Sequence, residues 1–191
     1  MPVFLRPELS LALAALLGML WQTGLTADEA IFDPETGFRT AHYRGAVPAG
    51  VPGGKRVNLE QVDSLLNAGA ILLDVMPSEG AGADPVTGAW RLSRSHQTIP
   101  GATWVPDVGR GKITPAFESY FKSNLAKLSA GNPSKPIILF CQSDCWMAWN
   151  AVQRAAGYGY TKLYWFPEGT DGWVEWGDRK LVPIEPVPFT F

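Results

Sequence analysis

Short apolar runs alternate with amphipathic segments along most of the chain. Apolar runs of strand length occupy residues 70–75, 102–105, 136–140 and 162–166. Between them, apolar side chains recur at the spacing of a helix face in segments that begin near residues 58, 114 and 148. Strands that alternate with helices predict a parallel sheet with helices on both faces. We therefore expect an α/β fold with a doubly wound parallel sheet.

Polar residues at the ends of these segments indicate where the helices begin and end. Asn58 and Gln61 have the spacing of a capping box, and Gly69 should end that helix. Thr114 followed by Pro115 should start the next helix. The run over 136–140 is the most apolar, so we expect it at the centre of the sheet.

The N-terminus has the pattern of an export signal. Arg6 precedes an apolar run over residues 9–21, and Ala27 is a small residue at a suitable cleavage point. The run is shorter than the ~20 residues that span a bilayer. We expect a cleaved signal peptide and a periplasmic protein that has no membrane contact after cleavage; a buried N-terminal helix is the alternative.

The rest of the chain divides by composition. A segment rich in Gly and Pro precedes the α/β pattern, and a Pro-rich tail that we expect to be extended follows it. The predicted organisation is a signal peptide, an N-terminal extension, an α/β domain and a C-terminal tail, over residues 1–27, 28–56, 57–177 and 178–191.

Composition and charge exclude some classes of partner. Hydrophobic residues make up 46% of the 191 residues and charged residues 18%, which is enough apolar material for a packed core. The net charge is −2, with no block of like charge. Nucleic-acid binding requires a basic face that neutralises phosphates, so we expect no nucleic-acid partner.

The chemistry of the chain should centre on its two cysteines. Cys141 directly follows the central strand, and Cys145 lies four residues later, near the start of a helix. Loop amides and the helix dipole should lower the pKa of a thiol at such a position. Asp144 could cap the helix. An i,i+4 pair can approach the Cα separation of about 4.4–6.8 Å that a disulfide needs, so an inert disulfide is the alternative to a reactive thiol.

Other candidate residues lie near the same edge of the sheet. Ligands of open α/β sheets bind at the carboxyl ends of the strands, and Asp74 ends another predicted strand. His96 could act as an acid or base, or could donate a hydrogen bond within its turn. Arg91 and Arg94 lie on the long loop over residues 76–98 and could contact substrate.

Several motifs, in this order, resemble the rhodanese domain. The motifs are Leu72–Val75, His96–Ala102, Ile138–Cys141, Gly157–Tyr158 and Glu168–Trp173. The resemblance spans roughly residues 57 to 177 and implies a doubly wound sheet and a cysteine that carries a persulfide sulfur. It places Cys141 at the position of the catalytic cysteine.

A narrower resemblance covers nearly all of the chain after the signal peptide. Its motifs are Gly37–Arg39, His42–Arg44, Ser95–Ala102, Asp144–Ala151 and Pro167–Trp173. They are similar to the PQQ-dependent catabolism-associated CXXCW motif proteins, which implies an accessory role in PQQ-dependent alcohol oxidation. Here three residues, Gln142, Ser143 and Asp144, separate the cysteines, where the family name implies two.

The cysteine loop differs from that of ordinary rhodaneses. Trp146 stands where those proteins have a loop arginine, and Met76 replaces a second arginine at a strand end. An anionic donor such as thiosulfate therefore loses a charge-assisted contact worth about 1.5–3 kcal/mol. We expect weak or altered sulfurtransferase activity. The loop that binds the substrate should comprise Gln142, Ser143, Asp144, Trp146 and Met147.

Three functions fit these residues. The first is a carrier of sulfur or electrons in which Cys141 reacts with a small sulfur or redox substrate and Cys145 resolves the product. The second is a non-catalytic module that binds PQQ, or a component of a periplasmic PQQ-dehydrogenase system, against Trp146 and Trp149. The third is an accessory protein with an inert disulfide. Two Cys and two His are too few for an expected zinc site.

Overall fold

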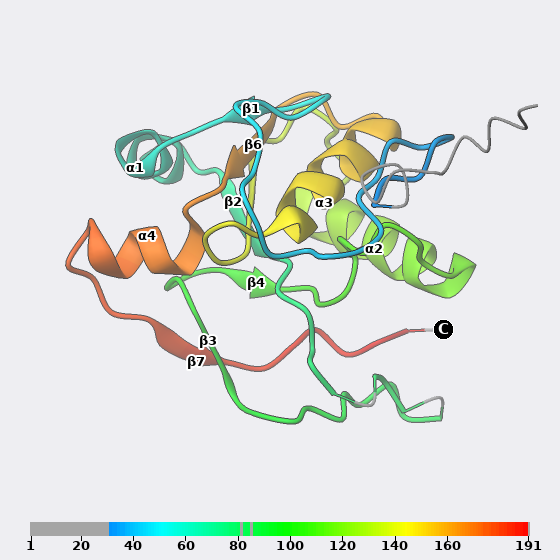
Figure 1. Cartoon of the computed structure of the whole chain (residues 1–191). Helices are drawn as coiled ribbons and strands as arrows, with labels where there is room; N and C mark the ends of the chain where they lie inside the picture. The colour runs from blue at the N-terminus through cyan, green and yellow to red at the C-terminus, as the bar shows by residue number, and fades with distance from the viewer. Residues whose placement is uncertain (1–30, 81, 85, 191) are drawn as a thin grey trace, which may run out of the picture.

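A computed structural model describes residues 31–80, 82–84 and 86–190. A parallel sheet of five strands, in the order β1-β6-β5-β2-β4, forms its centre (Figure 1). These strands are β1 Lys55–Arg56, β2 Ile71–Asp74, β4 Thr103–Trp104, β5 Ile137–Phe140 and β6 Leu163–Phe166. The predicted parallel sheet and the central position of 136–140 are both confirmed.

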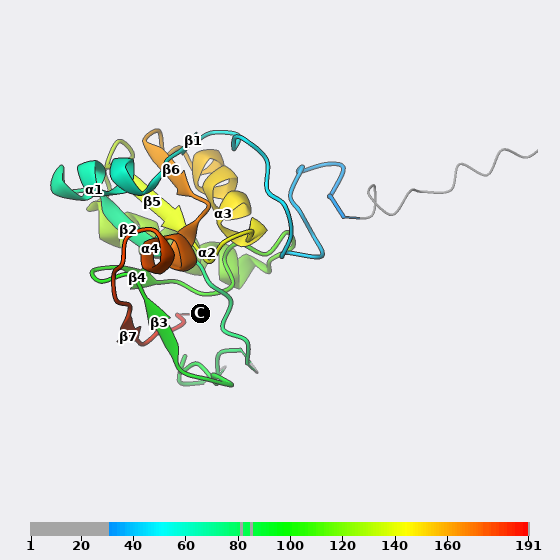
Figure 2. The ribbon, with the colours of Figure 1, turned by 60° about the vertical axis from the view of Figure 1, so that its left-hand side comes forward.

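Helices cover both faces of the sheet, as Figures 1 and 2 show. They are α1 Leu59–Asn67, α2 Pro115–Ser129, α3 Trp146–Gly157 and α4 Gly169–Glu175. Neighbouring residues of a strand point to opposite faces. Leu139 packs in the larger core cluster, under α2 and α3, whereas Phe140 packs in the smaller one with Val62 of α1 and Trp173 of α4. The doubly wound α/β fold is confirmed.

Local signals located the starts of α1 and α2 correctly. Asn58 caps α1, and its side chain and that of Gln61 bond reciprocally to each other's backbone NH at 3.0 Å. Thr114 caps α2, and Pro115 occupies its first turn. Gly69 follows α1 with a φ of 80°, a conformation that a residue with a Cβ rarely adopts.

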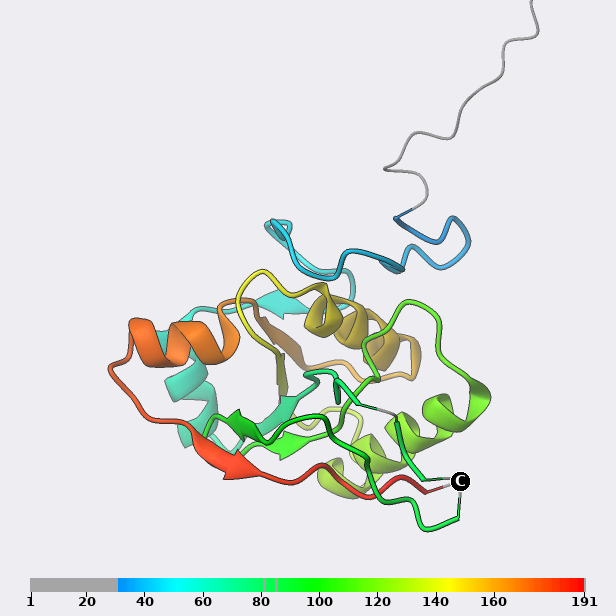
Figure 3. The same cartoon turned by 60° about the horizontal axis from the view of Figure 1, so that its bottom comes forward.

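The sequence pattern did not predict the short strands β3 (His96–Thr98) and β7 (Val182–Ile184). Strand β3 lies on the long loop and pairs antiparallel with β7 of the C-terminal tail. Beyond β7, Val187 N donates to Trp104 O and Phe189 N donates to Gly88 O. Figure 3 shows the tail running beside the long loop. The tail therefore fixes the long loop against the domain.

The extension before β1 runs over the N-terminus of α3 (Figure 2). Asn150 of α3 anchors it, since its Oδ1 accepts from Arg39 N at 2.9 Å and its Nδ2 donates to Arg39 O at 2.8 Å. The predicted signal peptide, residues 1–27, lies outside the described residues. None of the helices in the described part of the chain has the length and apolar character needed to cross a membrane.

Candidate functional site

The two cysteines meet at the carboxyl edge of the sheet. Cys141 directly follows β5, and Cys145 is the N-cap residue of α3. Their Cα atoms are 6.2 Å apart and their sulfur atoms lie at disulfide-bonding distance. The exposed fractions of the two residues are only 1% and 2%. The structure therefore has a buried disulfide at the edge where ligands of open α/β sheets bind.

The loop between the cysteines is fixed by the segment that leads into α4. Ser143 N donates to Asp171 Oδ2 at 3.1 Å, and Ser143 Oγ donates to Glu168 O at 2.9 Å. A Cβ atom added to Gly169 would lie 2.3 Å from the carbonyl oxygen of Cys141, so only glycine fits there. Sequence reasoning did not place Asp171 and Glu168 in the site, although both belong to the Gly-rich motif that supported the resemblance.

The prediction that Asp144 caps α3 is wrong. The N-cap residue is Cys145, and its side chain makes no capping hydrogen bond. Asp144 is exposed and has a φ of 54°, the left-handed conformation that Asp tolerates better than most residues. Its role in the loop is to make this tight turn without a glycine.

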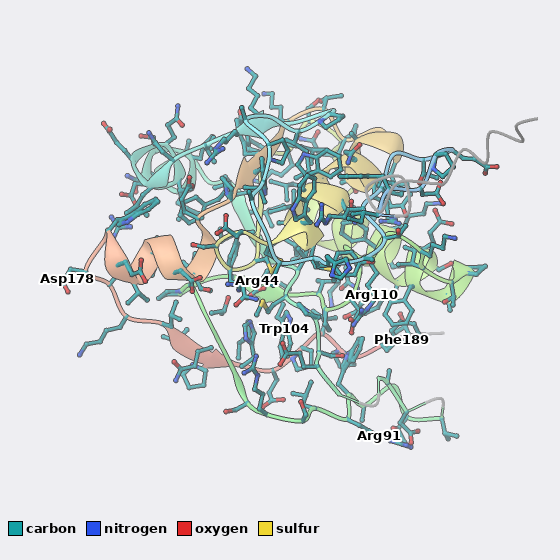
Figure 4. All side chains as sticks on the ribbon, in the orientation of Figure 1. Arg44, Arg91, Trp104, Arg110, Asp178 and Phe189 are labelled. Atoms are coloured by element: carbon teal, nitrogen blue, oxygen red, sulfur yellow. A yellow bond between two sulfur atoms is a disulfide. The ribbon has the colours of Figure 1, made fainter. Side chains whose placement is uncertain are left out.

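The N-terminal extension covers the start of α3 and the cysteine loop. Gly45 N donates to Asp144 O, and Trp146 N donates to Tyr43 O, both at 2.9 Å. This short antiparallel pairing places Arg44 opposite Cys145 (Figure 4 labels Arg44). The extension thus takes up the first helical amide of α3 and contributes to the burial of the cysteines.

The two tryptophans of the loop helix are packed under the same extension. The guanidinium of Arg39 lies 4.5 Å from the ring centroid of Trp146, and the ring of Phe32 lies 5.4 Å from it. Trp149 Nε1 donates to Gly50 O at 3.0 Å. Both indoles are buried. The structure therefore gives the proposed Trp-lined site for PQQ no open aromatic face.

The hydrogen bonds of Asn150 predict that this cover controls access to the cysteines. Asn150→Ala removes one acceptor and two donors, including the Nδ2 bond to Gly109 O at 2.8 Å. Each buried group left unpaired costs about 1–3 kcal/mol. We expect faster alkylation of the reduced thiols, measured by mass spectrometry under native conditions.

A buried asparagine elsewhere provides the control for that experiment. Asn124 of α2 also bonds to backbone, through Nδ2 to Tyr120 O at 2.8 Å, but this bond lies within α2. Asn124→Ala should lower stability without accelerating alkylation. Equal acceleration by both variants would show that alkylation follows global unfolding and not release of the extension.

Next to Cys141, a hydrogen-bond network fixes the backbone of Met76. Met76 N donates to Asp74 Oδ1, and Trp104 Nε1 donates to Met76 O, both at 2.8 Å. The other carboxylate oxygen of Asp74 accepts from Thr98 Oγ1 at 2.5 Å and lies 2.7 Å from His96 Nε2. The network brings Met76 Sδ to 3.2 Å from Cys141 Sγ. Sequence reasoning noted Met76 only as a missing arginine and not as a contact of the cysteine.

The remaining candidates fall into two groups. His96 is held by Asp74 and packs on Trp104, with ring centroids 4.3 Å apart. Arg91 and Arg94 are 60% and 66% exposed and pair with loop carboxylates, Arg91 with Asp84 and Arg94 with Glu79. Figure 4 shows Arg91 far from Trp104. The structure therefore does not bring Arg91 to the cysteines.

The loop residues themselves differ in accessibility. Met147 is buried in the larger core cluster, whereas Gln142 and Ser143 are partly exposed. A cavity of about 220 Å³ lies beside the loop. It is lined by Val47, Arg56, Ser143, Asp144, Pro167, Glu168 and Trp176. A small substrate can approach the loop on this side, where Arg56 is already paired with Glu168 at 2.9 Å.

Comparison with known proteins identifies the family. The profile of the rhodanese-like domain matches residues 58–175. The chain belongs to the rhodanese-like domain family. The rhodanese-like match thus contains four of the five strands of the central sheet, all except β1, together with helices α1 to α4 and both cysteines. No curated protein matches the chain.

Solved rhodanese-like structures resemble the chain only distantly. The human single-domain sulfurtransferase TSTD1 is 26% identical over 63% of this chain and 95% of its own, with a TM-score of 0.42. The polysulfide-sulfur transferase homodimer of Wolinella succinogenes is 19% identical over 65% and 76%, with a TM-score of 0.42. A thiosulfate sulfurtransferase of Pseudomonas aeruginosa is 19% identical over 72% of this chain but only 22% of its own, with a TM-score of 0.46.

Proposed function

We propose that this rhodanese-like protein accepts sulfane sulfur on Cys141 and releases it by forming a disulfide with Cys145. The observation that supports this most directly is the placement of both sulfur atoms at bonding distance where the central strand ends. The N-terminus of the 12-residue helix α3 lies directly after Cys145 and favours a negatively charged sulfur. The family resemblance assigns the persulfide to Cys141.

The chemistry balances without a cofactor. In the dithiol form, the Cys141 thiolate attacks the outer sulfur of an organic persulfide, the S–S bond of the donor breaks, and the donor leaves as a thiol. Cys141 now carries a persulfide. The Cys145 thiolate then attacks Cys141 Sγ, the disulfide forms, and the outer sulfur leaves as hydrosulfide. The sulfane sulfur gains two electrons and the two thiols lose them; a dithiol reductant then restores the protein.

The surroundings of the cysteines favour a donor without a large negative charge. Met76 and Trp146 contribute no cation. Arg56, in the wall of the cavity beside the loop, is paired with Glu168, and Arg94, which lines a small cavity with Met76, is paired with Glu79. An organic persulfide or polysulfide needs no guanidinium, whereas thiosulfate does. The substrate class that we propose is therefore a small persulfide.

Thiosulfate should consequently be a poor donor. Loss of a charge-assisted contact worth about 1.5–3 kcal/mol lowers the rate about 10- to 100-fold. A thiosulfate-to-cyanide assay should show this deficit relative to an ordinary rhodanese, while the same preparation reacts readily with an organic persulfide. Thiosulfate turnover equal to that of an ordinary rhodanese would contradict the argument from Trp146 and Met76.

We also propose that the protein is exported and serves PQQ-dependent alcohol oxidation. Export is supported by the Arg6 and apolar-run pattern, and the pathway by the resemblance of the loop and extension motifs to the CXXCW motif proteins. N-terminal sequencing of the protein from the periplasm should begin at or near Asp28. Recovery of the full-length chain from the cytosol would refute export.

A further inference from the structure

Three sulfur atoms from separate elements come together at this site. Cys141 Sγ lies 3.2 Å from Met76 Sδ and at bonding distance from Cys145 Sγ. The exposed fractions of Met76, Cys141 and Cys145 are 8%, 1% and 2%. A methionine and two cysteines therefore form a small, buried cluster of soft donors.

The chemistry of the cluster selects one kind of metal. Thiolate and thioether ligands favour Cu(I), whereas carboxylate and water favour hard cations. The carboxylate of Asp74, which accepts from Met76 N, also accepts from Thr98 Oγ1 and lies at hydrogen-bond distance from His96 Nε2. We propose that the dithiol form binds one Cu(I) ion through Cys141 Sγ, Cys145 Sγ and Met76 Sδ.

The ligand positions allow this geometry after the disulfide is reduced. Metal–thiolate bonds of about 2.3 Å place the sulfurs of a trigonal site about 4 Å apart. The Cα separation of 6.2 Å between the cysteines permits that spacing once the covalent bond is broken. Met76 has a flexible side chain on a backbone fixed at both its NH and its carbonyl.

The charge of the complex also suits the site. Binding displaces the two thiol protons and transfers no electron, so two thiolates and one Cu(I) carry a net charge of −1. The positive end of the α3 dipole lies directly behind Cys145 and stabilises that charge. The extension over Asp144 and Trp146 helps to exclude water from the ion. The binding requires only the dithiol and does not depend on sulfur transfer.

Anaerobic titration of the reduced, full-length protein with Cu(I) tests the proposal. Competition with the chromogenic chelator bathocuproine disulfonate should give one Cu(I) per chain, and X-ray absorption should show three sulfur ligands. Met76→Leu keeps the side-chain volume and should leave two sulfur ligands. Because loss of an outer-shell partner alone costs 10- to 100-fold in metal affinity, loss of a ligand should weaken binding at least about tenfold.

The possible results separate this proposal from the proposed sulfur transfer. Nitrogen or oxygen ligands, a stoichiometry other than one, or unchanged affinity in Met76→Leu would overturn the copper site. If Met76→Leu does not fold, the number of sulfur ligands in the wild-type protein tests the copper site: three ligands support it, and two overturn it. Persulfide formation on Cys141 is assayed without copper, so failure of either activity leaves the other result standing.

Discussion

Replacing Cys141 with serine should abolish persulfide formation, whereas replacing Cys145 with serine should trap it. Cys141 ends the central strand and receives the sulfane sulfur, so a hydroxyl at this position leaves no nucleophile that attacks the donor. Cys145 is the only other cysteine and lies within bonding distance. Without it, the persulfide on Cys141 has no internal thiol to release it as hydrosulfide.

Intact-mass spectrometry after exposure of each reduced variant to an organic persulfide measures this difference. Cys145→Ser should accumulate an adduct of one sulfur atom, and Cys141→Ser should show none. The two variants are matched controls, since each exchanges one buried sulfur for oxygen in the same loop. Persulfide on Cys145 in the Cys141→Ser variant would reverse the assigned roles. No adduct in either variant would contradict sulfur transfer and favour the alternative, a wild-type protein with an inert disulfide.

Replacing Asp74 with alanine should destabilise the domain and release Met76. The carboxylate is fully buried and accepts from Met76 N and Thr98 Oγ1, and it lies 2.7 Å from His96 Nε2. Removing one partner from a buried charged network costs about 3–5 kcal/mol. The free energy of unfolding of the reduced protein should fall by about that amount in urea denaturation, and the midpoint of thermal unfolding by about 6–20 °C.

Asp63 provides the matched control for Asp74. Its carboxylate pairs with a cation, through two bonds of 2.7 Å to Arg179, but its side chain is 39% exposed. Exposed ion pairs contribute about 0–1 kcal/mol, so Asp63→Ala should be nearly neutral. A loss below about 1 kcal/mol for Asp74→Ala as well would contradict the view that this network supports the site.

The elements that the sequence predicted correctly depend on local signals. The capping box at Asn58 and the Thr114-Pro115 start act within a few residues, and the apolar run over 136–140 could only be a buried strand. Helix α4 was missed because Gly169 and Gly172 have poor helix propensity. Gly169 is required there by its close approach to the carbonyl of Cys141, which is a tertiary contact.

The candidate site was predictable in its centre but not in its surroundings. A cysteine after the central strand and another at the start of the next helix follow from the periodicity alone. The cover of the loop does not, because the pairing of Tyr43 and Gly45 with Trp146 and Asp144 joins segments about a hundred residues apart with no patterned side chains. Likewise, the approach of Met76 to Cys141 depends on the register of β2 beside β5.

The most direct test of the account follows the native, reduced protein after it is mixed with one equivalent of an organic persulfide. Intact-mass spectrometry at successive times should show first the addition of one sulfur atom, then its loss together with two hydrogens, as hydrosulfide leaves and the disulfide between Cys141 and Cys145 closes. A dithiol reductant should then regenerate the starting mass. A protein that takes up no sulfur, or whose disulfide resists the reductant in the folded state, would contradict the proposed function.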